Sequence, residues 1–275
     1  MAEKKNERLG LCTVSVVTIC YNAEQVIEHT ILSAISQTYD NIEYIIVDGA
    51  STDGTIKIIN KYKDFIKIVI SEPDDGIYDA MNKGIKHATG DWIIFMNSGD
   101  VFASENVVEN IFHGDYNKNS VIYGDRIAIF EYASYHEKPA PISELKFRFP
   151  IFHQSAFIKT SIMKEMLYDT KYKICSDFDF FHKLYMRGDK FQYVEVTISK
   201  CDCISGISNT LSKSKQRIFE DCIIIHGTLL VKDRIRIAYT QVASLIKRLW
   251  YKASPSSYLY WRYKSYDNKP YMKRI

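Results

Sequence analysis

The sequence predicts an α/β protein with a doubly wound, mostly parallel sheet that is flanked by helices and followed by a basic helical extension. In the first hundred residues, apolar β-branched runs of strand length alternate with amphipathic segments of helical period, as in consecutive strand–helix crossovers. From about residue 212 onward the pattern is helical, and from residue 232 onward Lys and Arg strongly outnumber Asp and Glu. The 275 residues suit one large domain with an appendage.

Each element of the first half follows from one of these runs. Residues 13–20 (TVSVVTIC) form an apolar run that is typical of a central parallel strand buried on both faces. The further expected strands are residues 42–47, 66–70 and 92–96. The expected helices are residues 23–37, a segment that begins at 53–55, and residues 77–87. Three successive crossovers predict the doubly wound sheet.

The second half is less regular. We expect strands at residues 121–130, 152–158 and 191–198, a helix at 176–186 and a loop at 131–143. From about residue 212 the pattern is helical, with a break at residues 253–257 (ASPSS).

The composition is that of a globular chain, with 46% hydrophobic and 25% charged residues. It excludes a disordered, collagen-like or coiled-coil protein. No apolar run approaches the roughly 20 residues that a membrane-spanning helix needs. Residues 1–11 are expected to be a charged N-terminal tail, because no apolar segment of a signal peptide follows them. Six cysteines without a C-x-x-C pair favour reduced thiols and a cytoplasmic protein.

The charge is distributed unevenly along the chain. The formal net charge is +3, but residues 232–275 hold eleven Lys and Arg against Asp233 and Asp267. The body is therefore acidic and the extension is basic and rich in Tyr and Trp. This pattern favours a helix on an anionic membrane surface, with a solvated helix packed on the body as the alternative. Nucleic acid is not an expected partner, because no nucleic-acid-binding motif accompanies the charge.

Polar residues follow the predicted strands at the points where the strands end. Tyr21 and Asn22 follow the first strand, Asp48 ends the second, and Asp100 follows the fourth. Ligands of open α/β sheets bind at the carboxyl ends of the strands, so these residues predict a binding site. The alternative, that such residues only form turns and helix caps, is strongest for Asp53, which precedes a helix.

Four segments in order carry a resemblance to a known family. They are T-x-x-Y-N from residue 18, V-D-G-A-S-T-D-G-T from 47, E-P-D-x-G-I-Y-D-A-M-N-K-G from 72 and G-D-W-I-x-F-M-N-S-G-D from 90. Together they resemble family 2 glycosyltransferases, whose fold is the nucleotide-sugar-binding GT-A fold. The most similar subgroup comprises bacterial enzymes that build O-antigen and other exopolysaccharide repeat units. The resemblance covers about residues 12–205.

The resemblance implies that Thr18, Tyr21 and Asp48 hold the nucleoside. Asp48 would accept a hydrogen bond from N3–H of uracil, and the Tyr21 ring would pack on the base. The other donor-binding residues implied are Asn22, Asp75, Asp79, Asn82, Ser98 and Gly99. A cap or first-turn role is the alternative for the acidic residues of the helix at 77–87.

Asp100 is the metal ligand that the resemblance implies. Many relatives have Asp-x-Asp or Asp-Asp here, whereas the segment from Asn97 to Asp100 supplies a single carboxylate. One carboxylate with two diphosphate oxygens and waters still suits Mn²⁺ or Mg²⁺, which prefer oxygen ligands. Such a cation would stabilise the charge on the departing diphosphate.

The segment S-D-F-D at residues 176–179 resembles the family's E-D-x-D motif, with Ser in place of Glu. Asp177 is therefore the implied catalytic base, and Asp179 is its neighbour on the acceptor side. His153 and Gln154 resemble a His-Gln pair that faces the donor diphosphate or the acceptor. The alternatives are a cap role for Asp177 and a structural role for His153.

These implications define an inverting glycosyltransferase. Residues 12–211 would form the GT-A catalytic domain, with a nucleotide-binding half at 12–100 and an acceptor half at 101–211. Residues 212–275 would form a membrane-associating extension. The enzyme would transfer a hexose of the Glc, Gal or GlcNAc type from a UDP-sugar to a saccharide on polyprenyl diphosphate, in O-antigen or capsule synthesis.

The expected location is cytoplasmic and peripheral, on the inner face of the bacterial inner membrane, and a homodimer is left open. Two alternatives to this function also stay open. One is a transferase with another nucleotide donor, and the other is a non-catalytic module that binds nucleotide sugars. A nucleotidyltransferase would need a Gly-rich basic loop after the first strand, which residues 21–24 do not provide.

Overall fold

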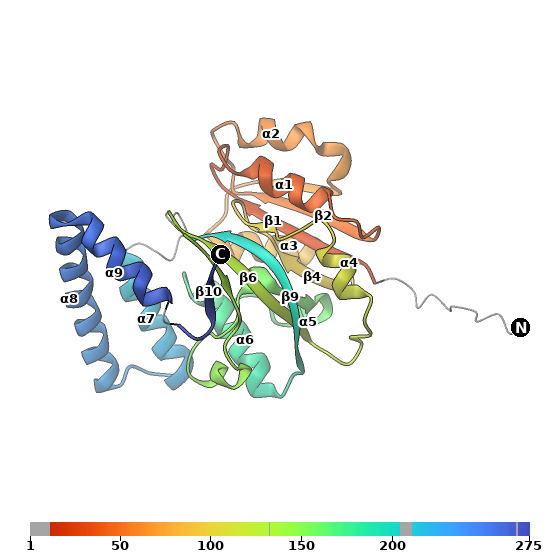
Figure 1. The fold of residues 1–275 in the computed structure, drawn as a ribbon. Helices are drawn as coiled ribbons and strands as arrows, with labels where there is room; N and C mark the ends of the chain where they lie inside the picture. The colour runs from red at the N-terminus through yellow and green to blue at the C-terminus, as the bar shows by residue number, and fades with distance from the viewer. Residues whose placement is uncertain (1–11, 132, 204–210, 268) are drawn as a thin grey trace, which may run out of the picture.

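The computed structural model describes residues 12–131, 133–203, 211–267 and 269–275, and the predicted tail at 1–11 lies outside them. Within these residues a mixed ten-stranded sheet runs through the molecule, with helices on both of its faces (Figure 1). The strand order along the main path is β10-β7-β6-β8-β4-β1-β2-β3. The predicted α/β architecture is confirmed.

The first half forms the parallel part of the sheet. Strands β1 (Val14–Cys20), β2 (Ile42–Asp48), β3 (Ile68–Ser71) and β4 (Trp92–Phe95) pair in parallel in the order β3-β2-β1-β4. Helices α1 (Ile27–Ile35), α2 (Thr55–Lys61) and α3 (Ile77–His87) connect them. Every residue of β1 and β4 is buried, as their unbroken apolar sequence predicts.

The second half adds antiparallel pairs. Strand β8 (Ala156–Lys159) lies antiparallel between β4 and β6 (Val121–Ile129). Strand β9 (Phe191–Asp202) pairs in parallel with β6 and antiparallel with the short β5 (Val101–Phe102). The remaining helices of this half are α4 (Val107–Phe112), α5 (Thr160–Met166) and α6 (Ser176–Arg187).

The prediction of a loop at residues 131–143 is wrong. The structure places β7 (Ser134–Glu137) there, antiparallel to β6. A 3₁₀ segment (Ile142–Lys146) begins within the last residues of the same range. Tyr135 and Glu137 are buried and their neighbours are less so. Four alternating residues are too short a signal to separate a strand from a loop.

A hydrophobic core lies on each face of the sheet. One core includes Val17, Phe95 and Phe178 and is covered by α3, α5 and α6. The other includes Val16 and Ile31 and is covered by α1, α2 and α4. The alternation of side chains along β1 supplies both cores from one strand.

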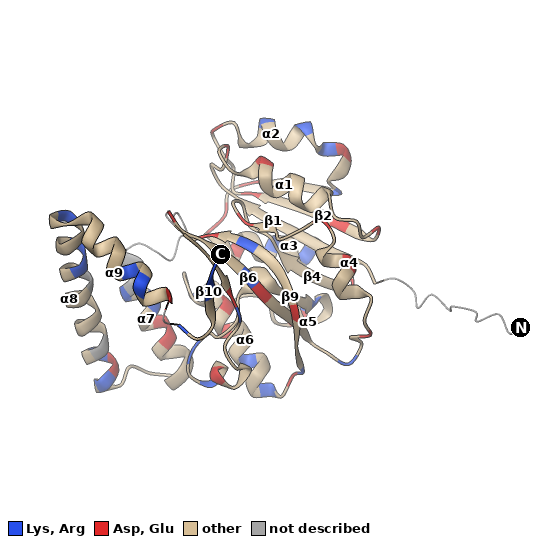
Figure 2. Cartoon of the chain, viewed as in Figure 1, with Lys and Arg blue, Asp and Glu red and all other residues tan. Residues whose placement is uncertain are grey.

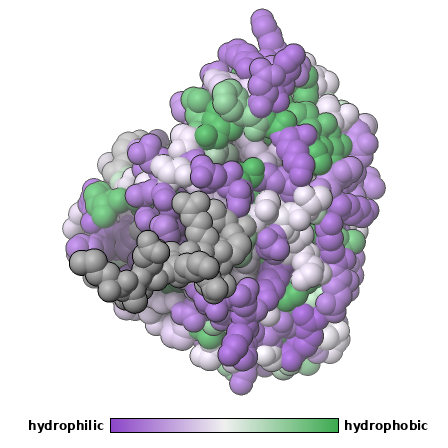
Figure 3. Space-filling view, turned by 90° about the vertical axis from the view of Figure 1, so that its right-hand side faces the viewer, coloured by the Kyte–Doolittle hydropathy of each residue, from purple (hydrophilic) through white to green (hydrophobic). Residues whose placement is uncertain are grey.

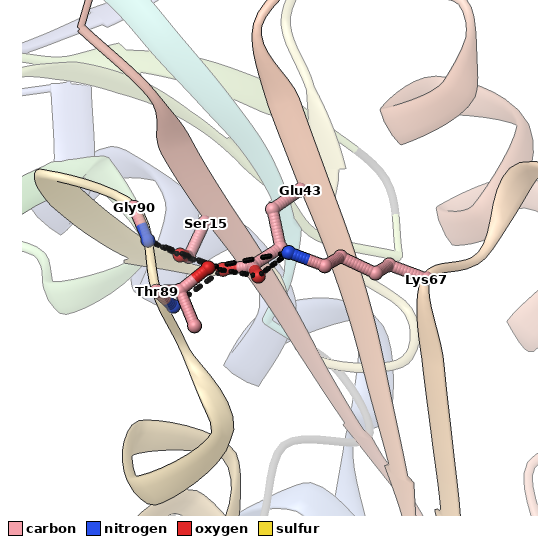
Figure 4. A network of polar contacts seen from close by, with 5 residues as sticks. All are labelled: Ser15, Glu43, Lys67, Thr89 and Gly90. Carbon is pink, nitrogen blue, oxygen red and sulfur yellow. Dashed lines mark hydrogen bonds and ion pairs between the residues drawn. The ribbon is translucent and has the colours of Figure 1, made fainter.

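The amino-terminal ends of the strands are joined by the buried carboxylate of Glu43 (Figure 4). It accepts hydrogen bonds from Lys67 Nζ (2.6 Å), from the backbone N–H of Thr89 (2.7 Å), and from the Ser15 hydroxyl and Gly90 N–H. This network connects β1 and β2 with the turn between α3 and β4. It lies at the opposite end of the strands from the predicted site.

The extension consists of α7 (Leu211–His226), α8 (Val231–Ala253), α9 (Pro255–Asp267) and β10 (Met272–Arg274). Strand β10 pairs antiparallel with β7, and Tyr266 of α9 stacks on Phe130 with ring centroids 5.0 Å apart. The chain thus returns to the sheet after its last helix. None of the helices in the described ranges is long and apolar enough to cross a membrane. Figure 3 shows the side of the molecule away from α8, where hydrophobic residues gather near the top and most of the rest is hydrophilic.

Candidate active site

The carboxyl ends of β1 and β2 carry a loop that Asp48 organises. Asp48 is fully buried, and its Oδ2 accepts hydrogen bonds from the backbone N–H of Ser51 (3.0 Å) and the hydroxyl of Ser71 (2.8 Å). Its Oδ1 accepts one from the Ser51 hydroxyl. These contacts fix the loop after β2. The contact of Asp48 with uracil stays a prediction.

Tyr21 and Asn22 lie at the same rim. The Tyr21 side chain is 63% exposed, which leaves its ring open to a planar ligand. Asn22 has a positive φ of 47°, and its Oδ1 accepts a hydrogen bond from the backbone N–H of Thr52 at 2.9 Å. Asn22 therefore shapes the loop beside Tyr21.

Gly49 brings a carboxylate to the Tyr21 ring. A Cβ atom built on Gly49 would lie 2.4 Å from Oδ2 of Asp74 and 3.4 Å from Cδ2 of Tyr21. The Asp74 Oδ1 accepts a hydrogen bond from Gly76 N–H at 2.9 Å. An exposed aromatic ring and a carboxylate thus flank a residue without a side chain.

Two residues that were predicted to bind the sugar donor make hydrogen bonds within the protein instead. The Thr18 hydroxyl is fully buried, donates to the carbonyl oxygen of Met96 (2.7 Å) and lies 3.0 Å from the Tyr44 hydroxyl. Asn82 donates to the carbonyl oxygen of Tyr168 (2.9 Å) and accepts from its N–H (2.8 Å). The structure does not bring either residue to the rim, because packing between neighbouring elements uses both side chains.

Asp75 and Asp79 lie at the start of α3. The backbone N–H of Asp75 donates to Oδ2 of Asp79 at 3.2 Å, and Lys83 Nζ is 3.5 Å from the same oxygen. Gly76 is the N-cap of α3 and no side chain makes a cap hydrogen bond, so Asp79 takes the first-turn position that the sequence left open, and Asp75 does not cap the helix. Asp75 itself is exposed.

The turn after β4 is held from both sides. The backbone N–H of Ser98 donates to the carbonyl oxygen of Ile19 (3.0 Å), and the backbone N–H of Gly99 donates to the hydroxyl of Thr30 (3.0 Å). Gly99 has a positive φ of 96°. The side chain of Asn97 begins the turn, and its buried Oδ1 has no hydrogen-bond partner in the described residues. A buried amide oxygen without a partner is costly, so it marks a position where a ligand or water fits.

Asp100 ends this turn and is only 8% exposed. Burial raises the pKa of its carboxyl group to about 6, opposed by the charge of His153 and by hydrogen bonds from Cys201 and Gln154. The charge of Arg126 acts in the same direction. The predicted residues Asp100, His153 and Gln154 are therefore brought together.

Arg126 supplies a fixed cation near Asp100. Its guanidinium lies 4.0 Å from the ring centroid of Phe152 and pairs with Glu137 through Nε (2.7 Å) and Nη2 (2.6 Å). A stacked and paired guanidinium keeps one orientation, which suits recognition of an anionic group.

Asp177 lies in the first turn of α6 and faces His153. Its Oδ2 is 3.3 Å from Nδ1 of His153, and its Oδ1 accepts the N–H of Phe178 at 2.9 Å. The Tyr78 hydroxyl is 3.1 Å from Oδ1. On the other side of the imidazole, Nε2 lies 3.4 Å from Nδ2 of Asn97. His153 therefore bridges the turn after β4 and helix α6.

The predicted neighbour Asp179 points elsewhere. Its Oδ2 lies 2.6 Å from Nζ of Lys183, one turn further along α6, and the residue is 5% exposed. This pairing within the helix separates Asp179 from the group formed by His153 and Asp177.

The segment before α6 is held by Glu220 of α7. The buried carboxylate of Glu220 accepts backbone hydrogen bonds from Lys173 (2.9 Å), Ile174 (3.0 Å) and Cys175 (2.8 Å). Two residues later the chain reaches Asp177. The C-terminal extension thus fixes the backbone that carries the predicted base.

The described residues contain no cluster of three or more His, Cys, Asp or Glu side chains that could hold a metal ion. The oxygen donors at the site are the carboxylate of Asp100 and the unpartnered Oδ1 of Asn97. Oxygen ligands of this kind fit Mg²⁺ or Mn²⁺ when substrate oxygens complete the shell.

Comparison with known proteins identifies the family of this chain. The model of the family described as "Glycosyl transferase family 2" matches residues 15–188, more than half of the chain. The chain belongs to glycosyltransferase family 2. The match spans the strands of the first half and ends just past α6, so the side chains of the proposed site other than Cys201 and Glu220 lie within it.

Two curated relatives of this family 2 glycosyltransferase come from Mycobacterium tuberculosis. A "PGL/p-HBAD biosynthesis glycosyltransferase" of Mycobacterium tuberculosis (strain ATCC 25177 / H37Ra) is 27% identical over 207 residues, covering 72% of this chain and 79% of that protein. An "uncharacterized glycosyltransferase Rv1514c" of the strain ATCC 25618 / H37Rv is 33% identical over 178 residues, or 61% and 67% of the two chains.

Solved structures share the fold of this glycosyltransferase. The S. aureus protein TarS 1–349 in complex with UDP-GlcNAc superposes with a TM-score of 0.62 at 16% identity, covering 84% of this chain and 71% of that one. The mannosyltransferase PcManGT of Pyrobaculum calidifontis, in complex with GDP-Man and Mn²⁺, gives a TM-score of 0.59 at 17% identity, covering 94% and 82%. These neighbours confirm the predicted GT-A-like fold.

Three residues of the glycosyltransferase site were not predicted from the sequence. Asp74 stands beside the predicted Asp75, and only the structure shows which of the two carboxylates approaches Gly49. Arg126 follows Gly124 and Asp125 in a strand without a recognised motif. Glu220 lies far along the chain in a helix whose pattern gives no hint of its partner.

Proposed function

We propose that this family 2 glycosyltransferase transfers a hexose from a UDP-sugar to a hydroxyl of a saccharide linked to polyprenyl diphosphate. The observation that carries the proposal is the position of His153, which touches Asn97 on the nucleotide side and Asp177 on the acceptor side. Donor and acceptor groups would meet at this residue. The UDP and UDP-GlcNAc bound to TarS, and the GDP-Man bound to PcManGT, support a nucleotide-sugar donor.

In the proposed donor site the Tyr21 ring packs on the base, and the absence of a side chain at Gly49 lets the carboxylate of Asp74 lie close to that ring. Asp100 and Asn97 would hold Mn²⁺ or Mg²⁺ together with diphosphate oxygens, and that cation would neutralise charge on the leaving group. Arg126 adds a positive charge of the protein itself near Asp100.

In the proposed reaction, the acceptor oxygen bonds to the anomeric carbon, the bond to the diphosphate breaks, and the proton of the acceptor hydroxyl passes to Asp177. His153 holds the carboxylate of Asp177 in place through Nδ1. Nδ1 of His153 faces the carboxylate of Asp177, so a ring proton on Nδ1 gives this contact its donor, and the side-chain amide of Asn97 lies on the other side of the ring. Attack from the face opposite to the leaving group inverts the anomeric configuration.

The acceptor and the location are part of the same proposal. A saccharide on polyprenyl diphosphate is presented at the cytoplasmic face of the bacterial inner membrane, which requires a peripheral enzyme there. The mycobacterial relative is named a PGL/p-HBAD biosynthesis glycosyltransferase, which supports a role in the synthesis of a glycosylated product. Synthesis of O-antigen or capsule is the role that we propose for this chain.

The test is release of nucleoside diphosphate from UDP-Glc, UDP-Gal, UDP-GlcNAc and GDP-Man, with a membrane extract of polyprenyl-linked saccharides as acceptor. We expect release from one UDP-sugar, dependent on acceptor, with the sugar recovered in the lipid fraction. A preference for GDP-Man would keep the transferase and change the donor. Tight binding of a UDP-sugar without turnover would favour the non-catalytic module.

A further inference from the structure

Helix α8 carries an unpartnered apolar stripe. Seven side chains on it are between 57% and 75% exposed: Val231, Ile235, Tyr239, Val242, Leu245, Ile246 and Leu249. Their spacing of three and four residues places them along one face of the helix. An exposed apolar face of about five turns is a feature of interaction sites rather than of ordinary protein surface.

The opposite face of α8 holds the helix on the protein. Asp233 and Ile237 are buried, and Asp233 accepts a hydrogen bond from the N–H of Leu230 at 3.0 Å. The helix packs against α7 and α9, and α9 leads to β10 in the main sheet. In Figure 1, α8 stands at the outer edge of the molecule, farther from the sheet than α7. The stripe is therefore presented outward from a fixed helix.

The charged residues of α8 are nearly all positive. The helix contains six Lys and Arg, and its one acidic residue is the buried Asp233. Lys232 and Arg234 are exposed near its beginning, and Lys247 and Arg248 near its end. Figure 2 shows Lys and Arg at both ends of the helix. The surface around the stripe is thus positive at either end.

This charge distribution favours an anionic bilayer over a second copy of α8 as the partner of the apolar stripe. A second copy of α8, parallel or antiparallel, would place cations opposite cations at both ends, which is unfavourable. An anionic bilayer offers acyl chains to the stripe and negative headgroups to the cations. Exposed aromatic side chains, Tyr251 at the end of α8 and Trp261 of α9, whose ring centroid lies 5.3 Å from Nζ of Lys247, suit the boundary between the two.

We propose that the stripe of α8 is a membrane-docking surface, and that the helix lies flat in the headgroup region of an anionic bilayer. The apolar side chains enter the acyl region, and Lys and Arg contact the lipid phosphates. The site is a surface of this chain alone, so it needs no donor or acceptor sugar. Its failure and the failure of the proposed transferase activity are therefore separate results.

The test is flotation of the full chain with vesicles. We expect binding to vesicles of equal parts phosphatidylcholine and phosphatidylglycerol, little binding to phosphatidylcholine alone, and weaker binding at about 0.5 M NaCl. The triple variant Ile235→Ser, Val242→Ser, Ile246→Ser should bind the mixed vesicles at least ~10-fold more weakly, because each lost side chain removes apolar burial.

The matched control replaces three equally exposed apolar residues elsewhere, as Phe65→Ser, Phe147→Ser, Met186→Ser. We expect its vesicle binding to equal that of the wild type, with unchanged circular dichroism in both variants. Equal binding by the stripe variant and the control would overturn the proposal. So would failure of the wild type to bind mixed vesicles, or a dimer that the stripe variant dissociates without any change in vesicle binding.

Discussion

The Nδ1 atom of His153 lies 3.3 Å from Oδ2 of Asp177, and the other ring nitrogen lies 3.4 Å from the amide of Asn97. One imidazole thus connects the turn after β4 with the first turn of α6. Asn97, His153 and Asp177 are far apart in the sequence. Strand β8 follows His153 and pairs antiparallel with β4, and this pairing brings His153 to the turn after β4.

The first prediction concerns this pair. Asp177→Asn should lower kcat by about 10³-fold, because the amide cannot take the proton of the acceptor hydroxyl. His153→Ala should lower kcat less, and in the double variant the two losses should not add, because the residues act on one proton transfer. Steady-state kinetics with the identified UDP-sugar measures this. Wild-type turnover in Asp177→Asn would remove Asp177 as the base.

The second prediction concerns Glu220, which holds three backbone N–H groups ahead of Asp177. Glu220→Gln places an amide donor against those donors, and the resulting shift of Asp177 should lower kcat roughly 10-fold with little change in the donor KM. The control Gln216→Ala removes a side chain that donates to Glu220 at 2.9 Å without touching that backbone. A proportional loss of kcat in both variants would argue against positioning by Glu220.

The third prediction is a pH dependence of stability at the other end of the sheet. Burial alone raises the pKa of Glu43, but hydrogen bonds from Lys67, Ser15 and Thr89 outweigh it and lower the pKa to about 2 from 4.5. The folded state therefore binds the Glu43 proton less readily than the unfolded chain does. The stabilisation is complete above about pH 4.5 and is lost as the pH falls toward 2.

Glu43→Gln should reduce the free energy of unfolding at pH 7 by on the order of 2 kcal/mol and flatten its acid dependence. Urea unfolding between pH 7 and pH 3 measures both quantities. The variant should keep its affinity for nucleotide, because the Glu43 network lies away from the rim. An unchanged acid slope in the variant would show that other carboxylates dominate it.

The fourth prediction concerns Gly49. A methyl group there would meet Asp74 Oδ2 at 2.4 Å and the Tyr21 ring at 3.4 Å, so Gly49→Ala should displace both side chains. We expect about 10-fold weaker UDP binding with little change in Tm, since the neighbours that must move are at the surface. Tyr21→Phe, which keeps the ring, should bind UDP nearly as well as the wild type. Unaltered UDP affinity in Gly49→Ala would place the nucleoside elsewhere.

The parallel strands could be predicted because each is an uninterrupted apolar run that ends in polar residues, as in β1 and β4. Helix α3 was predicted over the residues it occupies, because its apolar positions repeat at helical spacing. Strand β7 and the closing β10 could not be predicted, since each has only a few residues and gains its stability from partners elsewhere in the chain.

The site was predicted unevenly for a related reason. Asp100, His153, Gln154 and Asp177 lie in motifs, and the structure brings these four residues together. Thr18 and Asn82 lie in motifs as well, but a motif does not tell whether a side chain faces a ligand or its own backbone neighbours. Glu220 could not be predicted, because its role depends on a contact between two helices that only the fold defines.

The most direct test of the central claim is calorimetric titration of UDP into the protein, with Mn²⁺ and with EDTA, beside GDP and CDP. We predict UDP-selective binding that requires the cation and is lost in Asp100→Ala, while Lys57→Ala, an exposed change on α2, binds as the wild type. The absence of binding to all three nucleotides, in the presence of Mn²⁺ and with the fold intact, would contradict the proposed donor site.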